Sequence, residues 1–162
     1  MPITPFHFGA GVALHAAAPR HVSFLSFCVA NILIDVEPLY YMLTQQYPLH
    51  RFLHTYIGAT FILALSFVLF IFALWLVTFF PIPDWLRWQE LKPAPVAAGA
   101  AAGSYSHIVL DSVMHDDITP LSPFSDSNAL LGAVSLDTLH WSCAVAGFAA
   151  IVLLGVRRIS GK

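Results

Sequence analysis

Charged side chains are scarce in this chain of 162 residues. Lys, Arg, Asp and Glu together make up 10% of the sequence, whereas 58% of the residues are hydrophobic. An average soluble domain is about a quarter charged, so this chain has too few charges to cover a soluble surface. The same apolar composition argues against an intrinsically disordered chain. We therefore expect an integral membrane protein in which residues 1–162 form a single membrane domain.

Basic runs, cysteines and a leader sequence are also lacking. The seven Lys and Arg residues form no basic run, which argues against a nucleic-acid-binding protein. The two cysteines, Cys28 and Cys143, both lie in apolar runs, so no disulfide framework is expected. The first residues have neither the basic region nor the small-residue cleavage pattern of a signal peptide, and we expect the N-terminus to be retained.

Long apolar runs, by contrast, are frequent. A helix that crosses a bilayer needs about 20 apolar residues. Four runs reach this length, at residues 21–43, 55–80, 94–114 and 136–156. A shorter run at residues 5–18 ends before Pro19, which cannot continue a helix. These runs predict an all-α fold, a polytopic membrane helix bundle of four long transmembrane helices plus a short N-terminal membrane helix.

The basic residues lie unevenly at the two ends of this expected bundle. If each segment crosses in turn, the end that holds the N-terminus has Arg51 alone. The opposite end has Arg20, Arg87, Lys92, Arg157, Arg158 and Lys162. Because Lys and Arg are enriched on the cytoplasmic side of membrane proteins, we expect the N-terminus outside and the C-terminus in the cytoplasm.

Ligand-type side chains gather at the outer end of the expected bundle. They come from four segments of the sequence: His7, Asp35, Glu37, His50, His54, His107, Asp111 and His115. Within two of these segments the residues are spaced four apart, which places them on one helix face. Imidazoles and carboxylates at this spacing are typical of a divalent metal site of the zinc type. Six of them are the expected metal ligands: His7, Asp35, His50, His54, His107 and Asp111.

The candidate ligands outnumber those that one tetrahedral ion takes. Two arrangements stay open, namely two or more metal ions, or one ion with carboxylates behind its ligands. We expect zinc, with manganese as the alternative. Glu37 or His115 is the expected general base or orienting residue, and Arg51 is expected to hold a phosphate oxygen, as guanidinium geometry favours.

Other polar residues and other functions are alternatives to this metal site. We expect His15, His21 and His140 to be packed or hydrogen-bonded residues, and Asp116, Asp117 and Asp126 to be solvated loop acids. Haem between two histidines would not need the carboxylates of this layer. A proton or ion pathway would need polar groups further down the bundle, where the third and fifth segments are almost wholly apolar. Two alternatives stay open, namely a non-enzymatic membrane subunit that uses the site for metal handling or assembly, and a haem-binding membrane protein.

Two motifs follow the early His7 in order. They are His50-Arg51-Phe52-Leu53-His54-Thr55 and Ser106-His107-Ile108-Val109-Leu110-Asp111, with Thr119-Pro120 after the second and the acidic stretch Asp35-Val36-Glu37-Pro38 before the first. In these motifs residues 4–125 resemble a family of membrane-bound, metal-dependent hydrolases of bacterial and archaeal inner membranes. The resemblance implies a bacterial inner-membrane location and hydrolase activity.

The residues and the resemblance together lead to one expected function. We expect metal-dependent hydrolysis of an ester, most directly a phosphoester of a lipid or envelope metabolite, with metal-bound hydroxide as the nucleophile. The expected partners are the lipid bilayer, a lipid or small phosphoester substrate, and further copies or subunits in an oligomer or membrane complex.

Overall fold

The computed structural model describes residues 6–161, and within that range the chain is helical without any β-strand. The long elements are α1 (Phe6–Ala17), α2 (Phe24–Leu43), α3 (Tyr56–Val77), α4 (Pro93–Met114) and α5 (Leu136–Ile159). Two short 3-10 helices, η1 (Phe52–His54) and η2 (Trp88–Glu90), lie in the connections. The prediction of an all-α fold is confirmed, and each predicted segment matches one helix, although α4 begins one residue before its predicted segment and α5 ends three residues after its own. Position 5 of the first predicted segment lies outside the described residues.

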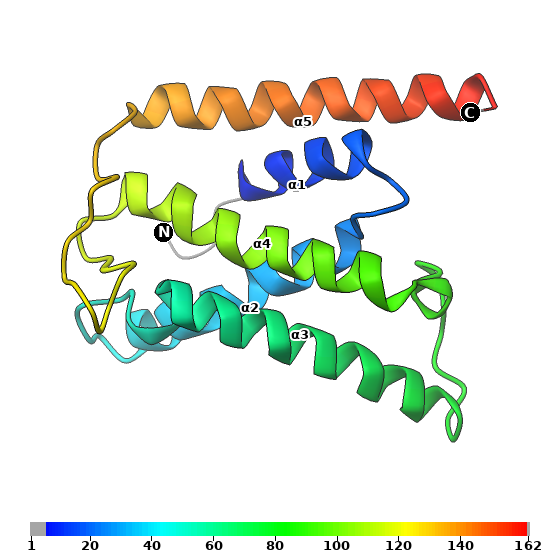
Figure 1. The fold of residues 1–162 in the computed structure, drawn as a ribbon, viewed down its shortest axis with the longest axis horizontal. Helices are drawn as coiled ribbons and strands as arrows, with labels where there is room; N and C mark the ends of the chain where they lie inside the picture. Colours follow the sequence, from blue (N-terminus) through cyan, green and yellow to red (C-terminus); the bar gives the residue numbers. More distant parts are fainter. Residues whose placement is uncertain (1–5, 162) are drawn as a thin grey trace.

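The helices run back and forth along one axis, so that the connections collect at two ends (Figure 1). α2, α3 and α4 pack on one another, whereas α5 packs mainly on α1. α1 lies between α5 and the other helices in Figure 1. This topology brings the start of α1, residues 44–55 and residues 115–135 to the same end of the molecule. The opposite end holds residues 18–23, residues 78–92 and the end of α5.

Side-chain caps and prolines set the helix boundaries. Ser23, Thr55 and Ser135 are the residues before α2, α3 and α5, and each side-chain oxygen accepts a hydrogen bond from the backbone N–H three residues later. Such a cap satisfies one of the N–H groups that a helix start leaves without a partner. Pro93 is the first residue of α4, where its missing N–H costs no helical hydrogen bond.

Small residues let α2 and α4 approach closely. The buried core between α2, α3 and α4 contains Ala30, Ile34, Ala59, Ile62, Ala100 and Ile108. At Gly103 on α4 a Cβ atom would lie 2.6 Å from the carbonyl oxygen of Phe27 on α2. Only glycine fits this contact, and close backbone packing of this kind is common between helices in membranes.

Three of the helices are long and apolar enough to cross a membrane, namely α2, α3 and α5. This is fewer than the four long helices and one short helix that the sequence predicted to lie in the membrane. α4 has 22 residues, but His107, Asp111 and its serines lower its hydropathy below that of a typical span. α1 has 12 residues and measures about 18 Å, which is shorter than the ~30 Å hydrocarbon core of a bilayer.

Replacement of Gly103 by alanine tests the contact between α2 and α4. The new Cβ would lie 2.6 Å from the Phe27 carbonyl oxygen and 3.0 Å from Asn31 Nδ2, so the two helices must separate. We expect Gly103→Ala to lower the unfolding free energy by roughly 1–3 kcal/mol, as overpacking does, and to lower the melting temperature in detergent.

Gly155→Ala on α5 is the matched control. A Cβ at this position meets nothing within 4 Å among the described residues, and alanine is favoured over glycine inside a helix by about 0.5–1 kcal/mol. We expect this variant to melt at or above the wild-type temperature. Equal melting temperatures for the two variants would contradict the close contact.

Candidate metal centre

The candidate ligands meet at the end of the bundle where α1 begins. All six predicted metal ligands are almost completely buried: His7 is 3% exposed, Asp35 6%, His50 6%, His54 0%, His107 1% and Asp111 3%. They come from α1, α2, η1 with the loop before it, and α4, so segments far apart in the sequence supply one cluster. Ionisable groups are costly to bury unless they are paired or bind an ion. The cost of burying these charged or polar groups must therefore be offset by contacts between them or by a bound ion.

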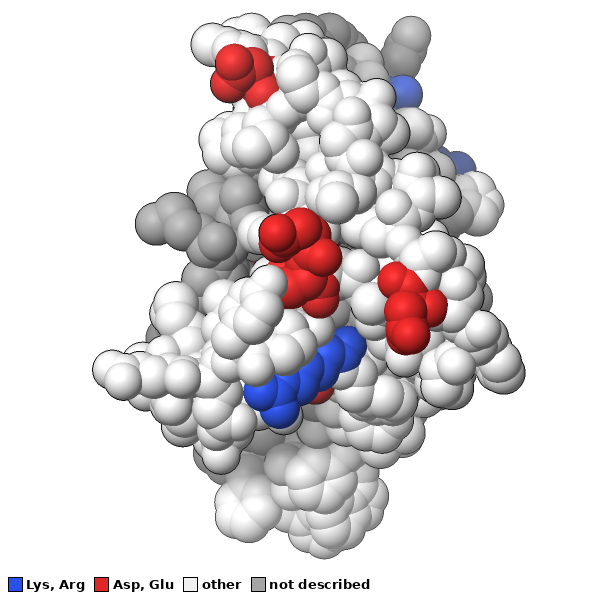
Figure 2. Space-filling model, turned by 90° about the vertical axis from the view of Figure 1, so that its left-hand side faces the viewer, with Lys and Arg blue, Asp and Glu red and all other residues white. Residues whose placement is uncertain are grey.

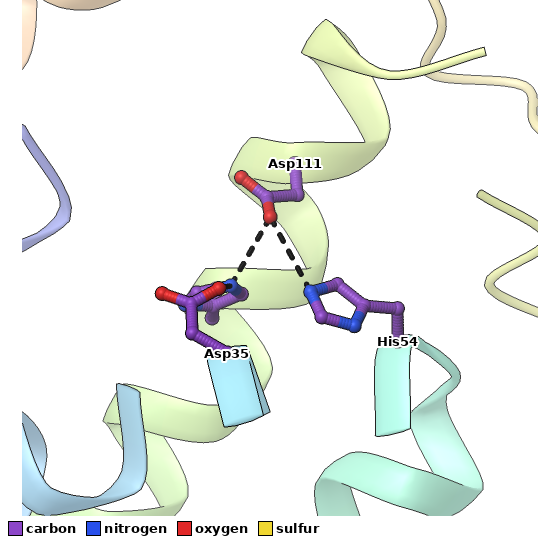
Figure 3. Close-up of side chains that lie close together, drawn as sticks. Asp35, His54 and Asp111 are labelled. Carbon is purple, nitrogen blue, oxygen red and sulfur yellow. Dashed lines mark ion pairs between the residues drawn. The ribbon is translucent and has the colours of Figure 1, made fainter. Parts of the chain in front are cut away.

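Asp111 on α4 is the centre of the first group of ligands. Its Oδ2 atom lies 3.1 Å from His107 Nε2 and 3.5 Å from His54 Nε2. His107 Nε2 also lies 3.4 Å from Asp35 Oδ1. Figure 3 shows Asp35 and His54 reaching from α2 and η1 toward Asp111. One ligand atom from each of these four residues lies within 4.8 Å of the others, which is close enough for a single ion to bind all four.

The orientation of His107 is fixed from behind by Asn31. Asn31 Nδ2 donates a hydrogen bond of 2.9 Å to the Phe27 carbonyl, so its Oδ1 faces His107 Nδ1 at 3.0 Å. Because an amide oxygen only accepts, the hydrogen of His107 lies on Nδ1. In the neutral ring, Nε2 then presents its lone pair to the carboxylates of Asp35 and Asp111. Either a second proton on Nε2 or a metal ion between these atoms makes the contact attractive.

His7 lies against the same cluster from α1. Its ring stacks on His107 with centroids 4.4 Å apart and planes 11° apart, and its Nε2 lies 3.0 Å from Asp111 Oδ1. The stack brings a second imidazole against the carboxylate that faces His107. Neutral imidazole is the form that binds a metal ion.

A second group of ligands lies beside the first. His50, Asp111 and His115 each offer one ligand atom, and these atoms lie within 4.8 Å of one another. The His50 ring lies 4.4 Å from the ring of His115 and 4.6 Å from that of His54. His50 Nδ1 donates to Asp117 Oδ1 at 2.7 Å. A carboxylate behind a histidine is the arrangement that orients many metal-binding imidazoles.

Burial and charge set the protonation states in this loop region. Burial lowers the pKa of His50, and the charge of His54 lowers it further, against the opposing effect of Asp117. Burial likewise lowers the pKa of His115. Burial alone would raise the pKa of Asp117, but the hydrogen bonds and charge of His50 outweigh it and lower that pKa. Near pH 7 the two histidines are therefore neutral, while the Asp117 carboxyl is ionised.

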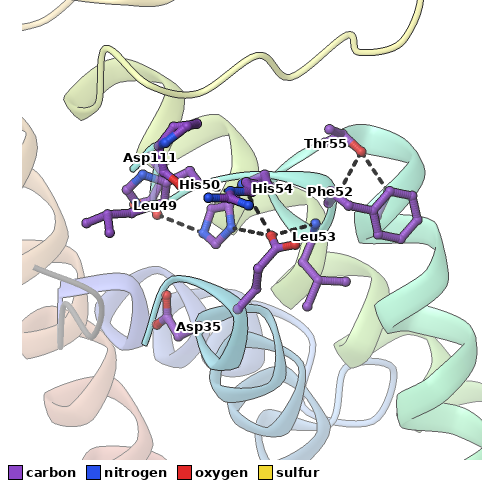
Figure 4. Close-up of polar contacts among 12 residues, drawn as sticks. Asp35, Leu49, His50, Phe52, Leu53, His54, Thr55 and Asp111 are labelled. Atoms are coloured by element: carbon purple, nitrogen blue, oxygen red, sulfur yellow. Dashed lines mark hydrogen bonds and ion pairs between the residues drawn. The ribbon is translucent and has the colours of Figure 1, made fainter. Parts of the chain in front are cut away.

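Glu37 holds the turn that presents His54. Its Oε2 accepts hydrogen bonds from the backbone N–H of Leu53 at 2.8 Å and of Arg51 at 3.3 Å, and it lies 3.8 Å from His54 Nδ1 (Figure 4). Thr55 closes the turn by donating to the Phe52 carbonyl at 2.8 Å. Glu37, which the sequence predicts as a base or an orienting residue, thus has the geometry of an orienting residue.

Arg51 lies at the surface beside the cluster. Its guanidinium lies 3.6 Å above the centre of the Tyr41 ring, and its Nε donates to the Pro48 carbonyl at 3.0 Å. Arg51 also lines a cavity of about 570 Å³ together with His50, Thr55 and Asp117. In Figure 2, which faces this end of the molecule, acidic side chains lie beside a basic one.

The buried donor atoms fit a divalent ion. Among the described residues, His54 Nδ1, His54 Nε2 and His107 Nε2 make no hydrogen bond, although they are completely buried. Each of these nitrogen atoms instead lies within 4 Å of a carboxylate oxygen, which is the spacing that a shared ion would bridge. Two imidazoles and the two carboxylates of Asp35 and Asp111 form the mixed nitrogen and oxygen set that zinc prefers. We conclude that this cluster could hold a metal ion.

Two residues of the site were not singled out from the sequence. Asn31 shares a helix face with Asp35, but its contact with His107 depends on the close approach of α2 and α4. Asp117 was expected to be a solvated loop acid, and this is wrong: its side chain is 7% exposed because it accepts hydrogen bonds from the loop that holds His50. Asp116 and Asp126 are exposed as expected.

Removal of the Asn31 amide tests its role behind His107. In Asn31→Leu the His107 ring loses the acceptor that fixes its hydrogen on Nδ1. We expect metal affinity to fall by roughly 10–100-fold, as when an outer partner of a ligand is removed, measured by competition with a zinc chelator. Ser66→Ala is the control, because Ser66 is buried on α3 and lines a different cavity. Equal affinity in Asn31→Leu and wild type would contradict this role.

A comparison of the chain with models of protein families, with curated proteins and with solved structures finds no match. The evidence for function is therefore the geometry of the site itself. A fold without a recognised relative carries no functional inference, whereas the cluster of buried imidazoles and carboxylates does.

Proposed function

We propose that this protein is a membrane-embedded, metal-dependent hydrolase that acts on an ester, most directly a phosphoester of a lipid or envelope metabolite. The observation that carries the proposal is the contact of His107 Nε2 with two buried carboxylates, at 3.1 Å and 3.4 Å, while Asn31 holds the hydrogen of His107 on Nδ1. This contact needs a positive charge between the atoms, which a metal ion would supply. A cavity that could admit a substrate is lined by His50, whose ring lies 4.6 Å from that of His54. The resemblance of the motifs to membrane-bound, metal-dependent hydrolases supports the same reaction class.

The proposal places the whole bundle in a bacterial inner membrane. α2, α3 and α5 supply the apolar surface, and α4 crosses as a fourth span. α4 can be more polar than the others because ten of its residues are buried, including His107 and Asp111. Arg51 is the basic residue at the site end, so this end is extracytoplasmic in the proposed orientation.

The depth of the site fits a lipid substrate. Asp111 lies one turn before the end of α4 at Met114, and His54 lies directly before α3 begins at Tyr56. Both positions are at the ends of helices, where the headgroups and ester bonds of lipids meet the protein. A lipid phosphoester could therefore reach the cluster without leaving the membrane surface.

The residues of the cluster would have different roles around a bound ion. Asp35, His54, His107 and Asp111 would hold it, with His7 packed against His107. A bound divalent ion would lower the pKa of a water molecule and polarise a phosphoryl oxygen. Glu37 and Asn31 keep His54 and His107 in position.

His115 and Arg51 would act on the substrate side. The imidazole of His115 would accept the proton of an attacking water molecule if one ion is bound. The planar guanidinium of Arg51 would bind a phosphate oxygen at the mouth of the cavity. The stacking of Arg51 on Tyr41 keeps this group in place.

Loss of the His107 imidazole tests the proposed activity. We expect purified wild-type protein, loaded with zinc or manganese, to hydrolyse a chromogenic phosphodiester or a phospholipid in mixed micelles, and a chelator to abolish this. His107→Ala should insert into the membrane but lose bound metal, and its activity should fall by at least about 100-fold, since a metal ligand is removed.

His15→Ala is the matched control, because His15 lies at the other end of α1 and contacts the Val22 carbonyl at 2.7 Å. It should keep both metal and activity. Bound metal in wild type without any hydrolysis would instead support a non-enzymatic metal-handling subunit. A red protein with a Soret band would support haem.

Removal of the Arg51 guanidinium tests its role toward phosphate. We expect Arg51→Ala to raise the KM for an anionic phosphodiester roughly 10-fold or more, about 1.4 kcal/mol for a charge-assisted hydrogen bond. The KM for a neutral carboxyl ester of similar size should change little. A similar change for both substrates would mean that Arg51 acts only through the fold of the loop.

A further inference from the structure

The second group of ligands is separate from the four residues that would hold the first ion, except for one shared residue. Asp111 belongs to both groups, whereas His50 and His115 belong only to the second. The two groups are adjacent, since the rings of His50 and His54 lie 4.6 Å apart. We propose that His50, His115 and Asp111 bind a second divalent ion, so that Asp111 bridges two ions. This inference rests on the proposed function, because it requires the first ion to be present.

His50 is prepared for metal binding in the same way as His107. Asp117 Oδ2 accepts from the backbone N–H groups of Leu49 at 2.9 Å and His50 at 3.2 Å, which leaves Oδ1 to accept from His50 Nδ1 at 2.7 Å. The carboxylate fixes the hydrogen of His50 on Nδ1, so Nε2 carries the lone pair. Asn31 does the same for His107. Each group thus contains one histidine that is oriented by an acceptor behind it.

Asp111 has the chemistry that a bridge requires. A carboxylate has two oxygens with about four lone-pair sites, and Oδ2 of Asp111 already faces His107 and His54. Asp111 is 3% exposed, so water solvates its carboxylate poorly and nearby groups or ions must offset its negative charge. One buried carboxylate that faces histidines from both groups is the geometry that two ions can share.

The charges of the layer also favour two ions over one. Two divalent ions bring four positive charges, and four carboxylates lie in contact with the histidines of the cluster. They are Asp35, Glu37, Asp111 and Asp117. Four carboxylates carry four negative charges, which equals the positive charge of two divalent ions. One ion would leave a net negative layer that repels an anionic substrate.

A pair of ions would suit a phosphoester substrate. Two ions that share a ligand stabilise both the attacking and the leaving oxygen in an in-line displacement at phosphorus. His115 would then be a ligand rather than a general base. Arg51, at the rim of the adjoining cavity, would bind a phosphate oxygen that the ions leave free.

Metal counting on the full chain in detergent tests the second position. After loading with zinc and removal of excess ion, we expect about two zinc ions per wild-type chain by mass spectrometry. His115→Ala should retain about one, and His21→Ala, a control at an exposed residue of the opposite end, should retain two. One ion in both wild type and His115→Ala would overturn the second position and leave the proposed hydrolase intact. No bound ion in wild type would overturn both.

Electron paramagnetic resonance of the manganese-loaded wild type provides a test that needs no variant. At saturating manganese we expect the spectrum of an exchange-coupled pair, because the two ions would share Asp111. The spectrum of isolated ions alone would overturn the bridge. Asp117→Asn adds a graded readout, with affinity for the second ion reduced by roughly 10–100-fold and the first ion retained.

Discussion

The site depends on a buried imidazole that faces negative charge. Asn31 Oδ1 accepts from His107 Nδ1, and His107 Nε2 faces the carboxylates of Asp35 and Asp111. In an environment of low dielectric constant this contact needs a positive charge between the atoms, which either a second proton on the ring or a metal ion supplies. A bound metal ion would be shared by the imidazole and both carboxylates, and this shared contact is why the cluster could hold a metal ion.

The rest of the fold keeps these groups at one end of the bundle. Gly103 allows α2 and α4 to approach so that Asn31 reaches His107. Glu37 on α2 accepts a hydrogen bond from the backbone N–H of Leu53, in the turn that contains His54. α1 is short, yet it places His7 against His107, and α5 covers α1 from outside. The packing of the helices therefore determines the geometry of the candidate metal site.

Much of the fold could be predicted from the sequence, because apolar runs between prolines and polar links define helices directly. The position of the ligands at one end could also be predicted, because successive antiparallel helices bring every second connection back to the same end of the bundle. What could not be predicted was the polar shell behind the ligands. Asn31 needs the contact between α2 and α4, and Asp117 needs the fold of the loop around His50. The sequence of α4 likewise does not show that its polar residues His107 and Asp111 are buried against other helices.

Anomalous diffraction from crystals loaded with zinc tests the central claim most directly. We predict a peak at the zinc absorption edge about 2.0–2.2 Å from His107 Nε2 and from carboxylate oxygens of Asp35 and Asp111, the usual bond lengths of zinc to nitrogen and oxygen. An ordered cluster without such a peak, in which His107 is protonated on both nitrogens and bonded to the two carboxylates, would contradict the account.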